Sequence, residues 1–121
     1  MRVFINLIFV VTLIGCVIVE QPKEPFSFDK KYKVETSIDG EGIIILTIYK
    51  DEQKIKTLNT RASIGHKYAV GWLKNENILI LNSSDIGVVV WSEADNFALH
   101  KQPGKYESYG RQLFNSKYKS T

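Results

Sequence analysis

Cysteine is almost absent from this chain. The only one in 121 residues is Cys16, so no disulfide bond can form within the molecule. This excludes the small disulfide-stapled folds that many secreted domains adopt. A single cysteine left over in an exported protein also needs an explanation of its own.

Histidine is scarce as well, and the two that are present, His66 and His100, lie far apart in the sequence. A zinc site combines several His, Cys or carboxylate ligands at close spacing. Neither histidine has such neighbours. We therefore predict no metal site and no cofactor.

Catalytic motifs are also missing. Ser83, Ser84 and Asp85 offer hydroxyl and carboxylate groups, but no Gly-x-Ser-x-Gly motif surrounds them, and calcium would require more carboxylates. Ser and Asp followed by Gly87 are typical of a turn, in which the side chains accept backbone hydrogen bonds. The sequence therefore predicts that the protein is not an enzyme. Enzymatic activity ranks third among the candidate functions, after protein binding and a structural role.

A strong charge of one sign is lacking too. The chain has 16 basic and 13 acidic residues, a formal net charge of +3. So small an excess argues against nucleic acid as the main partner. Basic residues do outnumber acidic ones between residues 99 and 121, which makes the C-terminal end locally cationic.

What the sequence does contain begins with an apolar N-terminus. Met1 and Arg2 precede an apolar stretch that ends at Gly15, which is the layout of a secretory signal peptide. A helix of about 13 residues reaches only ~20 Å, which is short for a bilayer core of ~30 Å. The apolar character continues to Val19, so an uncleaved membrane helix with an incidental cysteine is the alternative.

The end of this stretch, Leu13-Ile14-Gly15-Cys16, resembles the lipobox of bacterial prolipoproteins. The resemblance implies that the Cys16 sulfur receives a diacylglyceryl group and that a signal peptidase cuts between Gly15 and Cys16. It also implies the outer membrane, facing the periplasm, if the source has one, because Val17 replaces the Asp that favours inner-membrane retention. Lipidation would account for the single cysteine.

The chain is therefore expected to have three parts. Residues 1–15 are the signal peptide, residues 16–30 are the lipidated cysteine and a short polar tether, and residues 31–121 form one small envelope domain. The tether prediction depends on two prolines and mostly polar residues between Glu20 and Lys30.

The domain is expected to be mainly β. Alternating apolar runs separated by turn residues predict an antiparallel meander sheet of about six strands, with α+β as the broader class. The expected strands span 32–36, 43–50, 54–60, 66–74, 78–82 and 88–92. After Pro103 and Gly104, apolar residues recur at helical spacing, which predicts a short C-terminal helix, although Gly110 lies inside it.

Aromatic and basic residues alternate along this expected helix and form a possible binding surface. Its members are Tyr106, Tyr109, Arg111, Lys117 and Lys119. Such a mixture suits an anionic lipid, a glycan or an acidic protein, and it is equally consistent with a half-buried helix that has a solvated side.

Three more aromatic residues, Tyr68, Trp72 and Trp91, lie in expected strands. We expect them in the core, or in an exposed partner site if one face of the sheet has no helix over it.

Taken together, these features favour a lipid-anchored envelope lipoprotein that binds another protein of the envelope, as an inhibitor, an immunity factor or an accessory subunit. The membrane would be contacted through the lipid on Cys16. A structural role in the envelope or in an assembly is the alternative.

Overall fold

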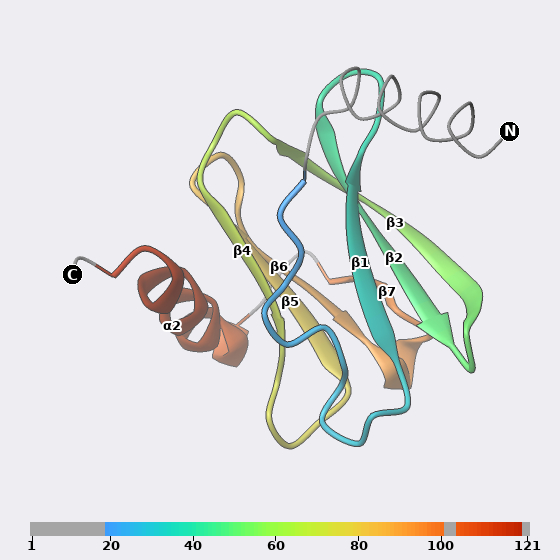
Figure 1. The fold of residues 1–121 in the computed structure, drawn as a ribbon. Helices are drawn as coiled ribbons and strands as arrows, with labels where there is room; N and C mark the ends of the chain where they lie inside the picture. Colours follow the sequence, from blue (N-terminus) through green and yellow to red (C-terminus); the bar gives the residue numbers. More distant parts are fainter. Residues whose placement is uncertain (1–18, 101–103, 120–121) are drawn as a thin grey trace, which may run out of the picture.

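A computed structural model describes residues 19–100 and 104–119 of the chain. Over these residues the fold is mainly β, as predicted, with one short helix at the C-terminal end (Figure 1). The strands are β1 (Lys33–Ile38), β2 (Ile43–Lys50), β3 (Gln53–Ser63), β4 (Tyr68–Trp72), β5 (Ile78–Ser83), β6 (Gly87–Ser92) and β7 (Ala98–His100). The helices are α2 (Glu107–Lys117) and the single turns η1 (Glu93–Asp95) and η2 (Gly104–Tyr106).

The first sheet contains β1, β2 and β3 as an antiparallel meander. Along β2 the side chains alternate between buried and partly exposed, so Ile44, Leu46 and Ile48 form the inner face. The turn before β2 is stabilised by Asp39, whose carboxylate accepts hydrogen bonds from the backbone N–H groups of Glu41 and Ile43.

The second sheet contains β4, β5, β6 and β7 in sequence order, again antiparallel. Its central strand β5 begins with Ile78–Leu81, four consecutive buried residues. This strand is apolar on both faces because the first sheet covers one face and α2 covers the other.

The domain therefore has three layers, whereas the sequence suggested one continuous sheet. The meander breaks between β3 and β4, where residues 64–67 carry the chain from one sheet to the other. Two sheets can bury each other's apolar faces, which a single six-stranded sheet cannot do. The main core lies between the sheets, and a smaller cluster lies between the second sheet and α2.

The seventh strand, β7, was not predicted. It has only three residues and follows Asn96 and Phe97, which both adopt left-handed backbone conformations (φ of 56° and 58°). A pattern of period two is not detectable over so short a strand.

Helix α2 packs closely on the second sheet because Gly110 has no side chain. A Cβ atom built on Gly110 would lie 2.7 Å from a methyl carbon of Val88. The Asn82 side chain also donates a hydrogen bond to the Gly110 carbonyl oxygen, at 2.9 Å. The glycine that weakened the helix prediction is therefore a point of close contact between the helix and the sheet.

Residues 19–30, predicted to belong to a tether, contact the domain at several points along their length. The carbonyl oxygen of Pro25 accepts hydrogen bonds from the Val34 N–H in β1 and from the Trp72 indole in β4, at 2.9 and 2.8 Å. Ser27 is buried and accepts a hydrogen bond from the Tyr32 N–H. This N-terminal segment therefore bridges the edges of the two sheets (Figure 1).

The expected signal peptide, which ends at Gly15, and the expected lipidation site Cys16 lie outside the described residues. Within residues 19–100 and 104–119, no helix has the length and apolar character needed to cross a bilayer.

Candidate functional site

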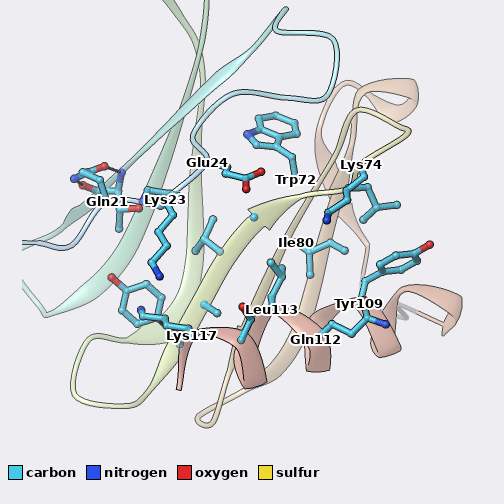
Figure 2. Close-up of a pocket in the computed structure, with 18 of the residues that line it drawn as sticks. Gln21, Lys23, Glu24, Trp72, Lys74, Ile80, Tyr109, Gln112, Leu113 and Lys117 are labelled. Carbon is cyan, nitrogen blue, oxygen red and sulfur yellow. Dashed lines mark hydrogen bonds between the residues drawn. The ribbon is translucent and has the colours of Figure 1, made fainter. Parts of the chain in front are cut away.

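A groove with a volume of about 630 Å³ lies between the N-terminal segment, β4 and α2 (Figure 2). This volume lies within the usual range for ligand sites in proteins. One wall is formed by residues 20–24, and the other by residues on α2 that include Tyr109 and Leu113. Strand β4 runs between these walls.

Strand β4 is the edge strand of the second sheet, and only one of its sides is paired. The Leu73 N–H bonds to the Ile78 carbonyl oxygen, and the Ser84 N–H bonds to the Lys67 carbonyl oxygen, both at 2.9 Å. Backbone groups alternate in direction along a strand, so the odd-numbered residues of β4 face β5. The N–H and C=O groups of the even-numbered residues therefore face the groove side.

The first of these outward residues, Tyr68, is capped by side chains from the end of α2. The Tyr118 hydroxyl accepts a hydrogen bond from the Tyr68 N–H at 3.0 Å and donates one to the Tyr68 carbonyl oxygen at 2.9 Å. The Lys117 ammonium group donates to the same carbonyl at 2.6 Å. One hydroxyl thus replaces the neighbouring strand at this position.

The next two outward residues, Val70 and Trp72, have no such cap. Neither makes a backbone hydrogen bond on its groove side to any residue within the described ranges. Both line the groove. The groove therefore contains two pairs of free backbone donors and acceptors beside apolar side chains.

The opposite edge, on β1, is already covered. The Gln21 side-chain amide accepts a hydrogen bond from the Thr36 N–H at 2.8 Å and donates one to the Thr36 carbonyl oxygen at 2.9 Å. Together with Pro25, which bonds to Val34, Gln21 acts as a substitute strand along β1. Within the described ranges, Val34 and Thr36 on the β1 edge are thus paired, whereas the outward backbone groups of Val70 and Trp72 on β4 are not.

An ion pair closes one end of the groove. The Lys117 ammonium group lies 2.9 Å from a Glu20 carboxylate oxygen and 4.1 Å from the centre of the Tyr68 ring. Burial alone would lower the pKa of Lys117, but its hydrogen bonds to Glu20 and Tyr118 outweigh burial and raise that pKa. Lys117 therefore stays charged and joins the N-terminal segment to α2.

Three charged residues on the rim form no ion pair with any residue that the structure describes: Lys23, Glu24 and Lys74. Figure 2 shows Lys23 extending from the N-terminal segment into the groove. Two positive charges and one negative charge leave the rim with a small positive excess.

The five residues of the binding surface predicted from the sequence do not form one face. Tyr109 and Lys117 line the groove, whereas Tyr106 packs under α2. Arg111 lies 3.6 Å from Glu107 on the exposed side of the helix, and Lys119 is exposed.

The groove also depends on residues that the sequence did not mark. Gln21 is one polar residue among many, and Val70 resembles any strand residue. Their roles arise from which edges the two sheets leave open, and the hydrophobic pattern does not specify this.

The three strand aromatics, Tyr68, Trp72 and Trp91, all pack against the core between the sheets. Trp91 is 2% exposed, and Tyr68 is also buried. Trp72 is half-buried, stacks on Tyr32 at 6.1 Å between ring centroids and borders the groove.

The Ser83–Gly87 stretch forms the predicted turn, in which the buried Ser83 hydroxyl accepts a hydrogen bond from the Asp85 N–H. The fold brings His66 within 3.9 Å of Asp85, but this pair is exposed and borders neither cavity described in the domain. His100 ends β7. Among the described residues, no three His, Cys, Asp or Glu side chains gather as a metal site would require.

A second polar cluster, whose hydrogen-bonded members do not line the groove, centres on Glu93. Its carboxylate accepts hydrogen bonds from Lys31, Tyr32 and Asn77 at 2.8, 2.6 and 3.0 Å. These bonds, with that from Lys31 the largest cause, lower the pKa of Glu93 to about 2. Burial, followed by the Glu93 contact, raises the pKa of Tyr32 to about 12.

Asp29 belongs to the same cluster and accepts a second hydrogen bond from Asn77, at 2.9 Å. The cluster thus ties residues 29–32 to the second sheet, which is a structural role.

Comparison with known proteins provides no further guide to this groove: no family model, no curated protein and no solved structure matches the chain.

Proposed function

We propose that the chain is a lipid-anchored lipoprotein of the bacterial envelope and that its domain binds another envelope protein through the groove beside β4. The observation that carries the binding role is the pair of uncapped residues, Val70 and Trp72, whose backbone groups face a cavity lined by both apolar and polar side chains. Unpaired donors and acceptors beside apolar surface are typical of a recognition site.

The charged groups around the groove support binding in preference to catalysis. Glu20 and Lys117 neutralise each other and hold the walls together. A catalytic site needs a positioned acid or base that is free to exchange a proton with a substrate. Lys117 is committed to its partners, because its raised pKa keeps it protonated.

The anchor is proposed from the Leu13-Ile14-Gly15-Cys16 resemblance. Cys16 precedes Val19, the first described residue, by three positions, a span of at most ~11 Å when extended. The groove begins at Glu20. A lipid on Cys16 would therefore hold the groove close to the bilayer, where it meets membrane-bound partners at high effective concentration.

Site-specific crosslinking in living cells tests the binding role. A photoreactive amino acid replaces either Tyr109 in the groove wall or Ile55 on the first sheet. These two side chains have similar exposure, 41% and 45%, and Ile55 lies outside the groove. We expect a discrete crosslinked protein from position 109 and none from position 55.

Equal crosslinking at the two positions would show that contact is not specific to the groove and would overturn the proposal. The absence of any crosslinked product at position 109 would do the same.

A further inference from the structure

We infer that the groove binds an extended segment of the partner protein as a fifth strand of the second sheet, paired with β4 through Val70 and Trp72. This inference rests on the proposed function and specifies which part of the partner enters the groove. The segment would lie between α2 and residues 20–24.

The spacing of the free backbone groups fits a polypeptide strand. Val70 and Trp72 are two residues apart, so their N–H and C=O pairs repeat at about 6.6–6.8 Å along the edge. A neighbouring strand presents complementary groups at the same repeat, one residue in two. A single polar group could satisfy one of these pairs, but a second strand satisfies both at once.

At two other edge positions, Thr36 of β1 and Tyr68 of β4, side chains cap the backbone groups. Gln21 and Tyr118 each place one side-chain group where a strand residue would both donate and accept, on Thr36 and Tyr68 respectively. Proteins cover or block edge strands because open edges pair with other chains. Val70 and Trp72 on β4 receive no such cap from any described residue.

A comparison of two of the edge strands, β3 and β4, supports the same inference. The exposed half of β3 contains Lys54 and Lys56, and charged residues of this kind discourage edge pairing. Strand β4 has the sequence YAVGW, with no charged residue and no proline. Its open edge therefore lacks the usual protection against pairing and is suited to accept a strand.

The length and chemistry of the segment follow from the groove. The Glu20–Lys117 ion pair closes one end, and β4 stops after Trp72, so the segment pairs over about four to five residues, ~13–17 Å. Side chains directly opposite each other share a face of the sheet. A residue opposite Val70 would therefore face the N-terminal segment, and its neighbours would face α2.

The α2 wall includes Leu113 and Tyr109, which favours apolar side chains at the positions that face it. The rim has Lys23 and Lys74 against Glu24, which favours an acidic residue beside the apolar ones. The occupant is thus an extended segment with apolar side chains toward Leu113 and Tyr109 and with an acidic flank.

The test uses the full-length protein in lipid nanodiscs, with random heptapeptides displayed on phage as the probe. A selected peptide is then synthesised with a single N-methyl group at each backbone position in turn. We expect about tenfold weaker binding when the methyl blocks an N–H that faces β4, and little change at the alternate positions. Loss of binding should therefore alternate along the peptide.

A matched pair of protein variants tests the other side of the same bonds. Val70→Pro removes the outward N–H, which proline tolerates at an edge strand, whereas Val70→Ala shortens the side chain and keeps the N–H. We expect about tenfold weaker peptide binding for Val70→Pro than for Val70→Ala. Circular dichroism checks that both are folded, and the N-methyl series on the wild type remains decisive if the proline variant is not.

Several results would overturn the inference. The first two are failure to select any peptide and N-methyl effects that do not alternate along the peptide. The other two are equal peptide affinity of the two folded Val70 variants and binding of a fatty acid in the groove when no peptide binds there. If crosslinking at position 109 succeeds while the N-methyl series shows no alternation, the binding role stands and strand addition fails.

Discussion

At the scale of single residues, glycines and polar side chains fix contacts that the hydrophobic pattern cannot specify. Gly110 is the clearest case, because it weakened the helix prediction while in the structure it lets α2 approach the sheet closely. Intrinsic propensity describes an isolated helix, and here tertiary packing decides.

This contact leads to a stability prediction. In an unpacked helix, Gly110→Ala would stabilise the helix by about 1 kcal/mol. Here the new methyl group would lie 2.7 Å from one Val88 methyl carbon and 3.2 Å from the other, and a branched side chain cannot rotate away easily. We expect a net loss of about 1–2 kcal/mol in the free energy of unfolding, measured by urea denaturation.

Gly71→Ala provides the control. Its added methyl group would meet the end of the Leu113 side chain at 2.6 Å, and Leu113 can turn into the groove. This variant should lose less stability than Gly110→Ala. If Gly110→Ala is more stable than the wild type, the helix does not pack as closely as described.

Glu93 leads to a prediction about pH. Its pKa is about 2 in the folded protein against the usual 4.5, so the folded state favours the carboxylate. That stabilisation is complete above pH 4.5 and is lost as the pH falls toward 2. Because the Glu93 side chain is 35% exposed, solvent screening reduces this stabilisation of the folded state to about 1 kcal/mol.

Comparison of Glu93→Gln with the wild type measures this contribution, because glutamine keeps the size and an acceptor oxygen. The two proteins should differ in the free energy of unfolding at pH 7 and converge as the pH falls below 4.5. A difference that stays constant down to pH 2 would mean that the charge of Glu93 does not stabilise the fold.

At the scale of the elements, the sequence predicted six of the seven strands and the C-terminal helix. The strands predicted correctly have β-branched or alternating apolar runs bounded by turn residues. Strand β2 has such a run, and the Ser83–Gly87 turn separates β5 from β6. The division into two sheets was missed, because periodicity identifies strands and not which strands pair. The three-residue β7 was too short to give any pattern.

The N-terminal segment is the element for which composition was least informative. Two prolines and many polar residues suggested a tether, yet the Gln21 side chain and the Pro25 carbonyl oxygen bond to the edge of β1. We expect a chain that starts at Lys23 to be less stable than one that starts at Val19. The shorter chain lacks the Gln21 bonds to Thr36 and the Glu20 partner of Lys117.

The expected loss is about 1–3 kcal/mol in the free energy of unfolding, from two hydrogen bonds and one ion pair. Urea denaturation of the two chains provides the measurement. Equal midpoints would show that residues 19–22 do not contribute to the stability of the domain.

At the scale of the whole molecule, the candidate site could be predicted from the sequence only in part. Tyr109 and Lys117 were singled out because aromatic and basic residues alternate along the helix, and both do line the groove. Arg111 has the same chemistry but lies on the outer side of α2. The free edge at Val70 and Trp72 results from the order of strands in the sheet, which is a property of the assembled fold.

The proposed anchor also belongs to this scale. Cys16→Ser should prevent maturation, because the sulfur atom accepts the lipid in proteins with a lipobox. Metabolic labelling with a fatty acid should mark the wild type and leave the variant unlabelled. Equal labelling of both would refute the proposed lipidation.

The bridging position of the N-terminal segment has a mechanical consequence. If Cys16 holds the chain in the bilayer and a partner is seated on β4, tension between the two acts across the groove. The load first reaches the Glu20–Lys117 and Gln21–Thr36 contacts, which lie nearest the anchor. Residues 19–25 would then peel from β1 before any strand is pulled from a sheet, so the bound segment would lose one wall of its site while the sandwich stays intact.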